Sequence, residues 1–491
     1  MSQSKSERPF KSKLKYVISN ITVEPIVFLY ILATMMNSLV NQNLSLEKAC
    51  RVNLHLNQSI CDALVVRDKS GYLPHHEVEV QQLVVKWAAY KTFIIGSIPV
   101  IAIIFFGSWS DRHRRRKPII LIPIFGDLIG SIALFVCSYF FLELSLEYSW
   151  MAETFSTGLF GGQCSLFLGV FSYVAGISSD EDRTLRIGSV AVVHVISIST
   201  GMFLSGILLN RLGFLGVYSI TTLSLTVAII YGTLKIKEKK IKEEEEKKIG
   251  FLKDLFALEY VKNTFKTCFQ KKVDGRRMKM IVIMLLCTMV VGSMQGEITV
   301  QYMYVRLKFG WNEVDFSIFN FFHFAIQLLG NIIALSFFSK YMKWDDAILG
   351  VIAVVTKIFA YLVYAFAPSG KHFYVGAILE LFNGSSFIAL RAIMAKIVPT
   401  NELGQSNSVF GICEALMPFI FGPIYSKIYI KTMTVVPGAF YLISGGMYVI
   451  ALCLFVFLYK TVEKQADHKI EEREKPSPQK IIDSEIYEKT V

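Results

Sequence analysis

Two long apolar runs, at residues 86–106 and 118–138, flank a strongly basic segment, 107–117. Each run is close to the roughly 20 residues that a helix needs to cross a bilayer. The charged segment between them is therefore expected to form a tight turn at a membrane surface, and its arginines and lysines predict that it faces the cytosol. With 53% hydrophobic and 18% charged residues, the chain is more apolar than the soluble norm of about 45–50% apolar and about 25% charged. We expect an integral membrane protein.

The same pattern recurs along the whole chain. Because a backbone in lipid must satisfy its hydrogen bonds internally, apolar runs of this length predict helices. The fold expected is an all-α membrane protein with twelve transmembrane helices in two six-helix bundles. The segments are centred near 22–41, 86–106, 118–138, 149–177, 187–208, 215–234, 280–304, 314–338, 345–367, 374–395, 406–428 and 437–460.

The polar connections predict the domain organisation. An even number of spans places both termini on one side, and the lysines and arginines that precede the first span and fill the middle link make that side cytosolic. The net charge of +12 is explained by this topology, so no nucleic-acid partner is expected. The predicted units are a cytosolic segment 1–21, a first bundle 22–234, a cytosolic linker 235–279, a second bundle 280–460 and a cytosolic tail 461–491.

The loop after the first span, about 42–85, is predicted to be external. It carries two glycosylation acceptor tripeptides, at Asn43 and Asn57, which are usable only in a lumenal or extracellular loop. Cys50 and Cys61 lie in the same loop, and a disulfide between them fits an oxidising compartment, although another external partner stays open. His75-His76-Glu77 is interpreted as a solvated stretch of this loop and not as a metal site.

Sequence motifs for enzyme chemistry are absent. The chain has no phosphate loop, no His-Glu-x-x-His, no Cys-x-x-Cys and no Gly-x-Ser-x-Gly. We therefore expect no enzyme activity, no cofactor, no metal site and no ATP-driven transport by this chain alone.

Polar residues inside the apolar runs are the candidates for function, because a charge buried in a bilayer costs about 2.5–3.5 kcal/mol or more. Glu24 has an alternative role as a helix-end charge, His323 as a packing histidine, and Lys357 with Glu380 as a structural pair. The full set is Glu24, Asp127, His194, Glu297, His323, Lys357, Glu380, Arg391 and Glu414.

Several motifs resemble those of solute carrier family 46, in the major facilitator superfamily, which includes the proton-coupled folate transporter and relatives linked to muropeptides and cyclic dinucleotides. The basic loop, with Gly107 and Asp111 ahead of its arginines, resembles the superfamily loop between the second and third helices. The more specific similarities are Glu24-Pro25, Arg183-Thr-Leu-Arg186, Gly296-Glu297 with Tyr302 and Trp311, and the stretch from Arg391 to Gly404.

This resemblance implies roles for individual residues. Gly107, Asp111 and Arg115 would belong to a cytosolic latch that opens when the carrier rocks. Arg391 matches an intramembrane arginine of the folate transporter that acts in substrate binding and coupling. A guanidinium pairs in a bidentate manner with carboxylates and phosphates, so an anionic substrate is expected.

The sequence also departs from the folate transporter. Three titratable positions of that protein align here with Gly176, Ala191 and Ser293. His194 lies three residues beyond Ala191 on the same helical face. We hypothesise that His194 takes over the role of the missing carboxylate in proton coupling, since histidine titrates near neutral pH.

The sequence thus predicts a secondary-active transporter of a small organic anion, folate-like, a muropeptide or a cyclic dinucleotide, working by alternating access with protons as the expected coupling ion. Its expected membrane is the plasma or an endolysosomal membrane. A facilitative uniporter, a transport-inactive receptor or scaffold, and less so a channel, are the alternatives. The cavity is expected to lie between the bundles, with substrate-binding or coupling residues Arg391, Glu297, His194, Tyr302, Tyr173 and Tyr361.

Overall fold

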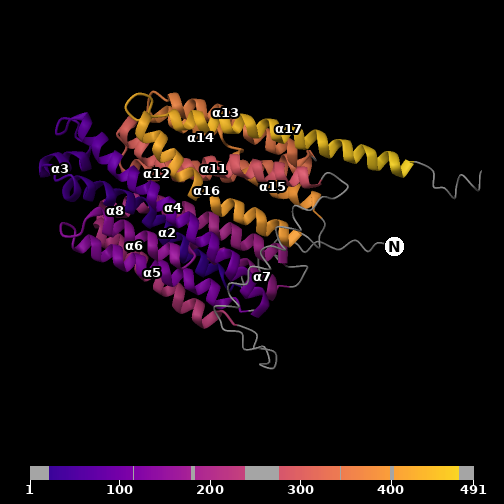
Figure 1. Ribbon diagram of the computed structural model, residues 1–491, viewed down its shortest axis with the longest axis horizontal. Coiled ribbons are helices and arrows are strands. Elements are labelled where there is room, and N and C mark those ends of the chain that lie inside the picture. The colour runs from indigo at the N-terminus through magenta and orange to yellow at the C-terminus, as the bar shows by residue number, and fades with distance from the viewer. Residues whose placement is uncertain are drawn as a thin grey trace, which may run out of the picture.

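The computed structural model describes residues 21–113, 115–178, 183–237, 276–342, 344–398 and 403–474, and all regular structure in these ranges is helical. Figure 1 shows long helices running side by side. Proline in the first turn of α2 and of α5, and an Asn312–Asp315 capping box before α12, mark helix starts. The helices are α2 (Glu24–Lys48), η1 (Ala49–Asn53), α3 (Gln58–Val66), α4 (Pro74–His113), α5 (Lys117–Tyr139), α6 (Leu146–Leu159), α7 (Gly162–Ile177), α8 (Arg183–Lys235), α11 (Arg276–Phe309), α12 (Glu313–Ile333), η3 (Ala334–Tyr341), α13 (Asp346–Phe366), α14 (Gly370–Leu379), α15 (Asn383–Ile397), α16 (Leu403–Thr432) and α17 (Ala439–Glu474).

The expected twelve crossings are confirmed. Ten stretches within the described residues are long and apolar enough to span a bilayer. One of them, Arg186–Lys235, has 50 residues, and the left-handed Gly213, with φ of 65°, divides it into two helices. The 40-residue α4 supplies one more crossing.

The helices form two halves that lie side by side, α2 to α8 and α11 to α17 (Figure 1). They meet along α4 against α16 and along α8 against α12. Glycine permits the close approach at both seams: a side chain on Gly96 would collide with the Phe419 backbone, and one on Gly206 with the Glu313 carbonyl. At both seams the halves are therefore in direct contact with the backbone of the other half.

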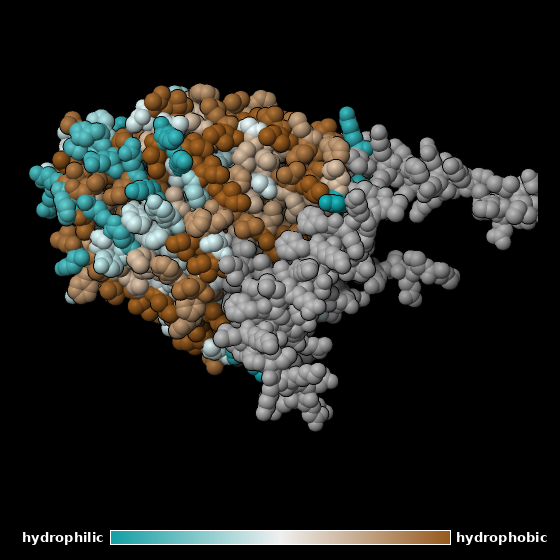
Figure 2. Space-filling view, in the orientation of Figure 1, coloured by the Kyte–Doolittle hydropathy of each residue, from teal (hydrophilic) through white to brown (hydrophobic). Residues whose placement is uncertain are grey.

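The two ends of the molecule differ. The disulfide end, as we name it, carries η1, α3 and the start of α4, and hydrophilic side chains gather there beside a hydrophobic middle (Figure 2). The opposite end, called the linker end, is where α8 stops and α11 begins. An apolar band next to a polar cap is the surface expected of a chain that crosses a membrane.

Two of the crossings are broken in the middle. The fourth consists of α6 and α7, separated at Gly161 and Gly162, whose φ angles are 85° and 52°. The tenth consists of α14 and α15, separated by a turn from Glu380 to Phe382. The breaks occupy corresponding places in the two halves, and paired discontinuous helices in transporters mark the substrate and ion sites.

Candidate functional site

Arg391 and Glu414 form an ion pair in the second half. Arg391, on α15 after the break, places its Nη2 atom 2.8 Å from Oε2 of Glu414 on α16. The guanidinium also lies over the rings of Phe387 and Phe410, 5.0 and 4.9 Å from their centroids. Its side chain remains 42% exposed, and Glu414 interacts electrostatically with Cys164 of the first half. Arg391 thus offers an accessible positive charge between aromatic faces.

His194 lies in the first half, on α8 beside the break of the fourth crossing. Its Nε2 is 3.2 Å from Nε2 of Gln163, the second residue of α7. The Phe167 ring packs edge-on against the imidazole at a centroid distance of 4.6 Å. The imidazole therefore has a neutral polar neighbour and an aromatic one.

The buried charges of the second half come together in one cluster around the break of the tenth crossing. Lys357 on α13 contacts Glu380, and its Nζ is 3.9 Å from Oε2 of Glu297 on α11. His323 on α12 places Nε2 2.7 Å from Oε1 of Glu380. The hydroxyl of Tyr364 also donates to Glu380. The sequence left open that His323 is a packing histidine and that Lys357 and Glu380 form a pair of their own. In the structure these residues and Glu297 form one connected group.

The three tyrosines expected at a cavity between the halves lie in three separate places. Tyr361 is buried against the Lys357 ammonium, 4.6 Å from its ring centroid, and so belongs to the charge cluster. Tyr173 is buried in the apolar core of the first half. Tyr302 is buried at the disulfide end, where its hydroxyl donates to Oδ1 of Asn43 at 2.7 Å. In this conformation core packing encloses Tyr173 and a hydrogen bond engages Tyr302, so neither side chain lines a cavity here.

A buried polar network at the disulfide end joins the two halves. Glu77 Oε1 on α4 lies 2.8 Å from Arg306 Nε on α11, and Arg67 Nη1 is 3.8 Å from the other carboxylate oxygen. The hydroxyl of Tyr429 on α16 donates to Gln81 at 3.0 Å. The interpretation of Glu77 as a solvated loop residue is therefore wrong: it is buried at the seam, and no sequence signal pointed to its partner.

Two further ion pairs lie in the first half. Lys91 of α4 contacts Glu153 of α6, with side chains 25% and 20% exposed, and neither residue was among the sequence candidates. Arg186 Nη2 lies 3.4 Å from Oε1 of Glu24, and both side chains are buried. Glu24 is therefore a buried ion-pair partner and not a charge that extends to the membrane surface.

The predicted latch lies at the linker end. The side chains of Gly107 and Asp111 fall outside the described residues, and Arg115 is exposed. Its neighbour Arg116 donates to the carbonyl of Ser172 on α7. The Arg116 guanidinium also occupies the space next to Gly176, so a side chain at position 176 would collide with Arg116. The arginine next to the predicted one therefore joins the loop to α7.

The external loop is only partly as expected. Cys50 and Cys61 form a disulfide, and Asn57 is exposed at the start of α3. Asn43, in contrast, is buried inside α2, where its amide donates to the Leu39 carbonyl at 3.1 Å. The glycosylation prediction for Asn43 is corrected, because an acceptor must be exposed and Asn43 is enclosed between the halves.

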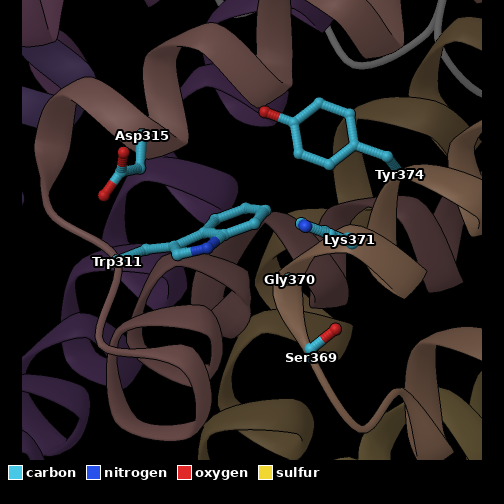
Figure 3. Close-up of a pocket in the computed structure, with 6 residues that line it drawn as sticks. All are labelled: Trp311, Asp315, Ser369, Gly370, Lys371 and Tyr374. Carbon is cyan, nitrogen blue, oxygen red and sulfur yellow. The ribbon is translucent and has the colours of Figure 1, made fainter.

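A pocket of about 550 Å³ opens at the disulfide end of the second half. Figure 3 shows Trp311 between Asp315 on one side and Tyr374 and Lys371 on the other. Gly370 and Ser369 complete the lining, so none of the predicted site residues faces this pocket.

Two helical halves with paired broken crossings and buried charges between them define a membrane transporter. The profile of the Major Facilitator Superfamily matches residues 26–423. The chain belongs to this superfamily and, within it, to solute carrier family 46.

Three known proteins illustrate the similarity. The lysosomal proton-coupled steroid conjugate and bile acid symporter of Gallus gallus is 25% identical over 90% of this chain and 94% of its own length. The probable peptidoglycan muropeptide transporter of Drosophila melanogaster is 20% identical over 88% of this chain and 84% of its own. The crystal structure of the human organic anion transporter MFSD10 (TETRAN) has a TM-score of 0.60 at 14% identity, covering 91% of this chain and 100% of that one, which shows a shared fold.

Proposed function

We propose that this transporter carries organic anions by alternating access, in symport with protons, across an endolysosomal or plasma membrane. The observation that carries the substrate class is the accessible Arg391 guanidinium, held between Phe387 and Phe410 after the break of the tenth crossing. Planar donors select a carboxylate, sulfate or phosphate, and the flanking rings favour an apolar or aromatic body.

Glu414 supplies the exchange step of this proposal. Its carboxylate neutralises Arg391 at 2.8 Å when no anion is bound. An arriving anion takes this place, and the displaced carboxylate loses its partner. Because Glu414 interacts electrostatically with Cys164 of the first half, its release can change the balance between two arrangements of the halves. His194 on α8 of the first half, 3.2 Å from Gln163, is the coupling residue named by the sequence hypothesis, and its replacement is tested beside that of the buried charges of the second half.

The disulfide end is assigned to the lumenal or extracellular side and the linker end to the cytosol. The Cys50–Cys61 disulfide supports this orientation because disulfides persist in oxidising compartments. The buried Glu77–Arg306 and Tyr302–Asn43 contacts then close the outer side, so the structure corresponds to a carrier closed to the outside. Lysosomal residence of the chicken relative favours the endolysosomal membrane.

The test is uptake into proteoliposomes from a panel of folic acid, a muropeptide, a cyclic dinucleotide, a sulfated steroid and a bile acid, with and without an imposed pH gradient. We expect saturable counterflow of at least one anion, and its loss in Arg391→Ala but not in a control, Lys427→Ala, which removes an exposed cation of α16. Binding without counterflow would instead identify a receptor, and flux indifferent to the pH gradient a uniporter.

A further inference from the structure

We propose that the cluster of Glu297, Lys357, Glu380 and His323 is the site that binds the coupling proton, an inference that rests on the proposed symport. The cluster lies within the second half, apart from the Arg391–Glu414 pair and from His194. The ligand proposed is a proton, because the cluster consists of groups that bind one: two carboxyls, an ammonium and an imidazole.

The charges of the cluster do not balance without a proton. Two carboxyl groups, Glu297 and Glu380, face a single ammonium, Lys357, and all three side chains are buried. Among the described residues, the ion pairs of these carboxyls involve Lys357 and His323 only. A neutral His323 therefore leaves one negative charge uncompensated in a low-dielectric interior, which is strongly unfavourable. One bound proton removes that charge.

Glu297 is the carboxyl with the weaker partners. Glu380 contacts Lys357 and Tyr364 and lies 2.7 Å from His323, whereas Glu297 has Lys357 at 3.9 Å. Oε1 of Glu297 is buried without a hydrogen bond of standard geometry among the described residues, and its polar neighbours besides Lys357 are the uncharged hydroxyls of Tyr361 and Ser444. In the part of the chain that the structure describes, the other titratable groups facing the two carboxyls are tyrosines: Tyr361 and Tyr364 on α13, Tyr425 on α16, and Tyr441 and Tyr448 on α17.

The arrangement also gives the proton a route. His323 sits on α12, the helix that packs on α8 of the first half, and its side chain is 17% exposed. From there the contacts run through Glu380 and Lys357 to Glu297. When Lys357 gives a proton to Glu297 and takes one from a protonated Glu380, the proton moves between the carboxyls and the net charge of the cluster stays at zero. Release of that proton leaves one negative charge, and uptake of another removes it.

Glu380 provides the connection to the substrate. It ends α14 at the break of the tenth crossing, and Arg391 lies on α15, the other half of that crossing. The Asn383 amide, at the start of α15, donates to the Glu380 carbonyl at 2.8 Å. A change of charge on Glu380 therefore acts at the joint that orients the helix holding the substrate-binding guanidinium.

His194 lacks the same requirement. Its hydrogen-bond contact is the uncharged Gln163 at 3.2 Å. A neutral imidazole satisfies that contact, so no charge imbalance demands a proton there. Replacing His194 should therefore leave proton binding intact, whereas replacing Glu297 of the cluster should abolish it.

The first test needs no substrate. Infrared difference spectra of the full-length protein in lipid, between about pH 8 and about pH 5, bracket the ordinary histidine pKa of about 6.5. We expect a deuterium-sensitive band of a buried protonated carboxyl in the wild type and in His194→Ala, and its loss in Glu297→Gln. Glu153→Gln is the matched control, because its carboxylate is paired with Lys91 in the first half. A band that persists in Glu297→Gln would overturn the proposal.

A double variant guards against a folding defect. Glu297→Gln with Lys357→Met restores one uncompensated carboxyl, Glu380, beside His323, and a pH-dependent signal should return. A folded double variant without that signal would contradict the charge argument.

The second test measures coupling in proteoliposomes with an anion that the wild type transports. Glu297→Gln should keep counterflow yet lose proton-driven accumulation by about ten-fold or more. The proposal would be rejected if Glu297→Gln accumulated the anion as the wild type does. It would also be rejected if His194→Ala lost proton-driven accumulation and Glu297→Gln did not. If no anion in the panel is transported, the proposed function fails, while the infrared result still decides whether the cluster binds a proton.

Discussion

Oε1 of Glu77 in α4 lies 2.8 Å from Nε of Arg306 in α11, and this buried contact joins the two halves at the disulfide end. Arg67 approaches the same carboxylate from the loop after α3 at 3.8 Å. The three side chains have low exposure, so the contact forms only when the halves are closed at this end. A carrier that works by alternating access must break it in each cycle.

Removing Arg306 should open the disulfide end. Arg306→Met leaves Glu77 buried with the more distant Arg67, and loss of one partner of a buried pair costs about 3–5 kcal/mol. Val80, three residues after Glu77 on α4, is buried and can report the opening. In Val80→Cys protein, labelling by a membrane-impermeant maleimide should rise when Arg306 is replaced.

The control for this experiment is Arg51→Met, which breaks the Arg51–Asp62 pair at the same end. Asp62 is 55% exposed, and exposed pairs contribute about 0–1 kcal/mol, so labelling should stay near the wild-type level. Equal labelling in Arg306→Met and Arg51→Met would contradict a gating role for the buried pair.

Replacing Glu414 should strengthen anion binding. In the proposed exchange its carboxylate, paired with Arg391, competes with the substrate for the guanidinium, and a charge-assisted hydrogen bond contributes about 1.5–3 kcal/mol. Glu414→Gln should therefore lower KM for the transported anion by about ten-fold or more, while Glu414→Asp, which keeps the charge, should stay close to the wild type. A KM that rises in Glu414→Gln would mean that Glu414 positions Arg391 instead of competing for it.

The sequence predicted the crossings well because bilayer thickness sets their length and composition directly. It did not predict the pairs that close the seams, since Glu77 and Arg306 are 229 residues apart and pairing over that distance leaves no local pattern. Lys91 and Glu153 were missed for the same reason. The Asn43 tripeptide misled because an acceptor motif says nothing about burial. The Gly161-Gly162 pair, in contrast, was a readable signal for a broken helix.

Glycosylation should occur at Asn57 and not at Asn43. Asn57 is exposed at the start of α3, whereas Asn43 is buried and bonded to Tyr302. Protein from a secretory-competent host should lose its glycosidase-sensitive gel shift in Asn57→Gln or Ser59→Ala and keep it in Ser45→Ala. A shift lost in Ser45→Ala would place Asn43 outside the seam, and a wild type without any glycan would question the lumenal assignment of the disulfide end.

The disulfide end should stay closed at the acidic pH of an endolysosome. Burial alone would raise the pKa of the Glu77 carboxyl, but the charges of Arg306 and Arg67, with hydrogen bonds from Arg306 and Gln81, outweigh burial and hold that pKa below its ordinary value. The ionised pair therefore contributes its full stabilisation above the unfolded-state pKa of about 4.3. That stabilisation is lost only as the pH falls through the lower folded-state value.

The measurement uses Val80→Cys protein. Because maleimide reacts too slowly in acid for rates to be compared directly, the protein is incubated at each pH with a thiosulfonate reagent. The extent of labelling is then divided by that of a denatured sample at the same pH. The ratio should be flat from about pH 7.5 to about pH 5 and rise only below the ordinary glutamate value. A rise already between pH 6 and pH 5 would mean that Glu77 takes up a proton in the working range, and the outer closure would then itself respond to lumenal acid.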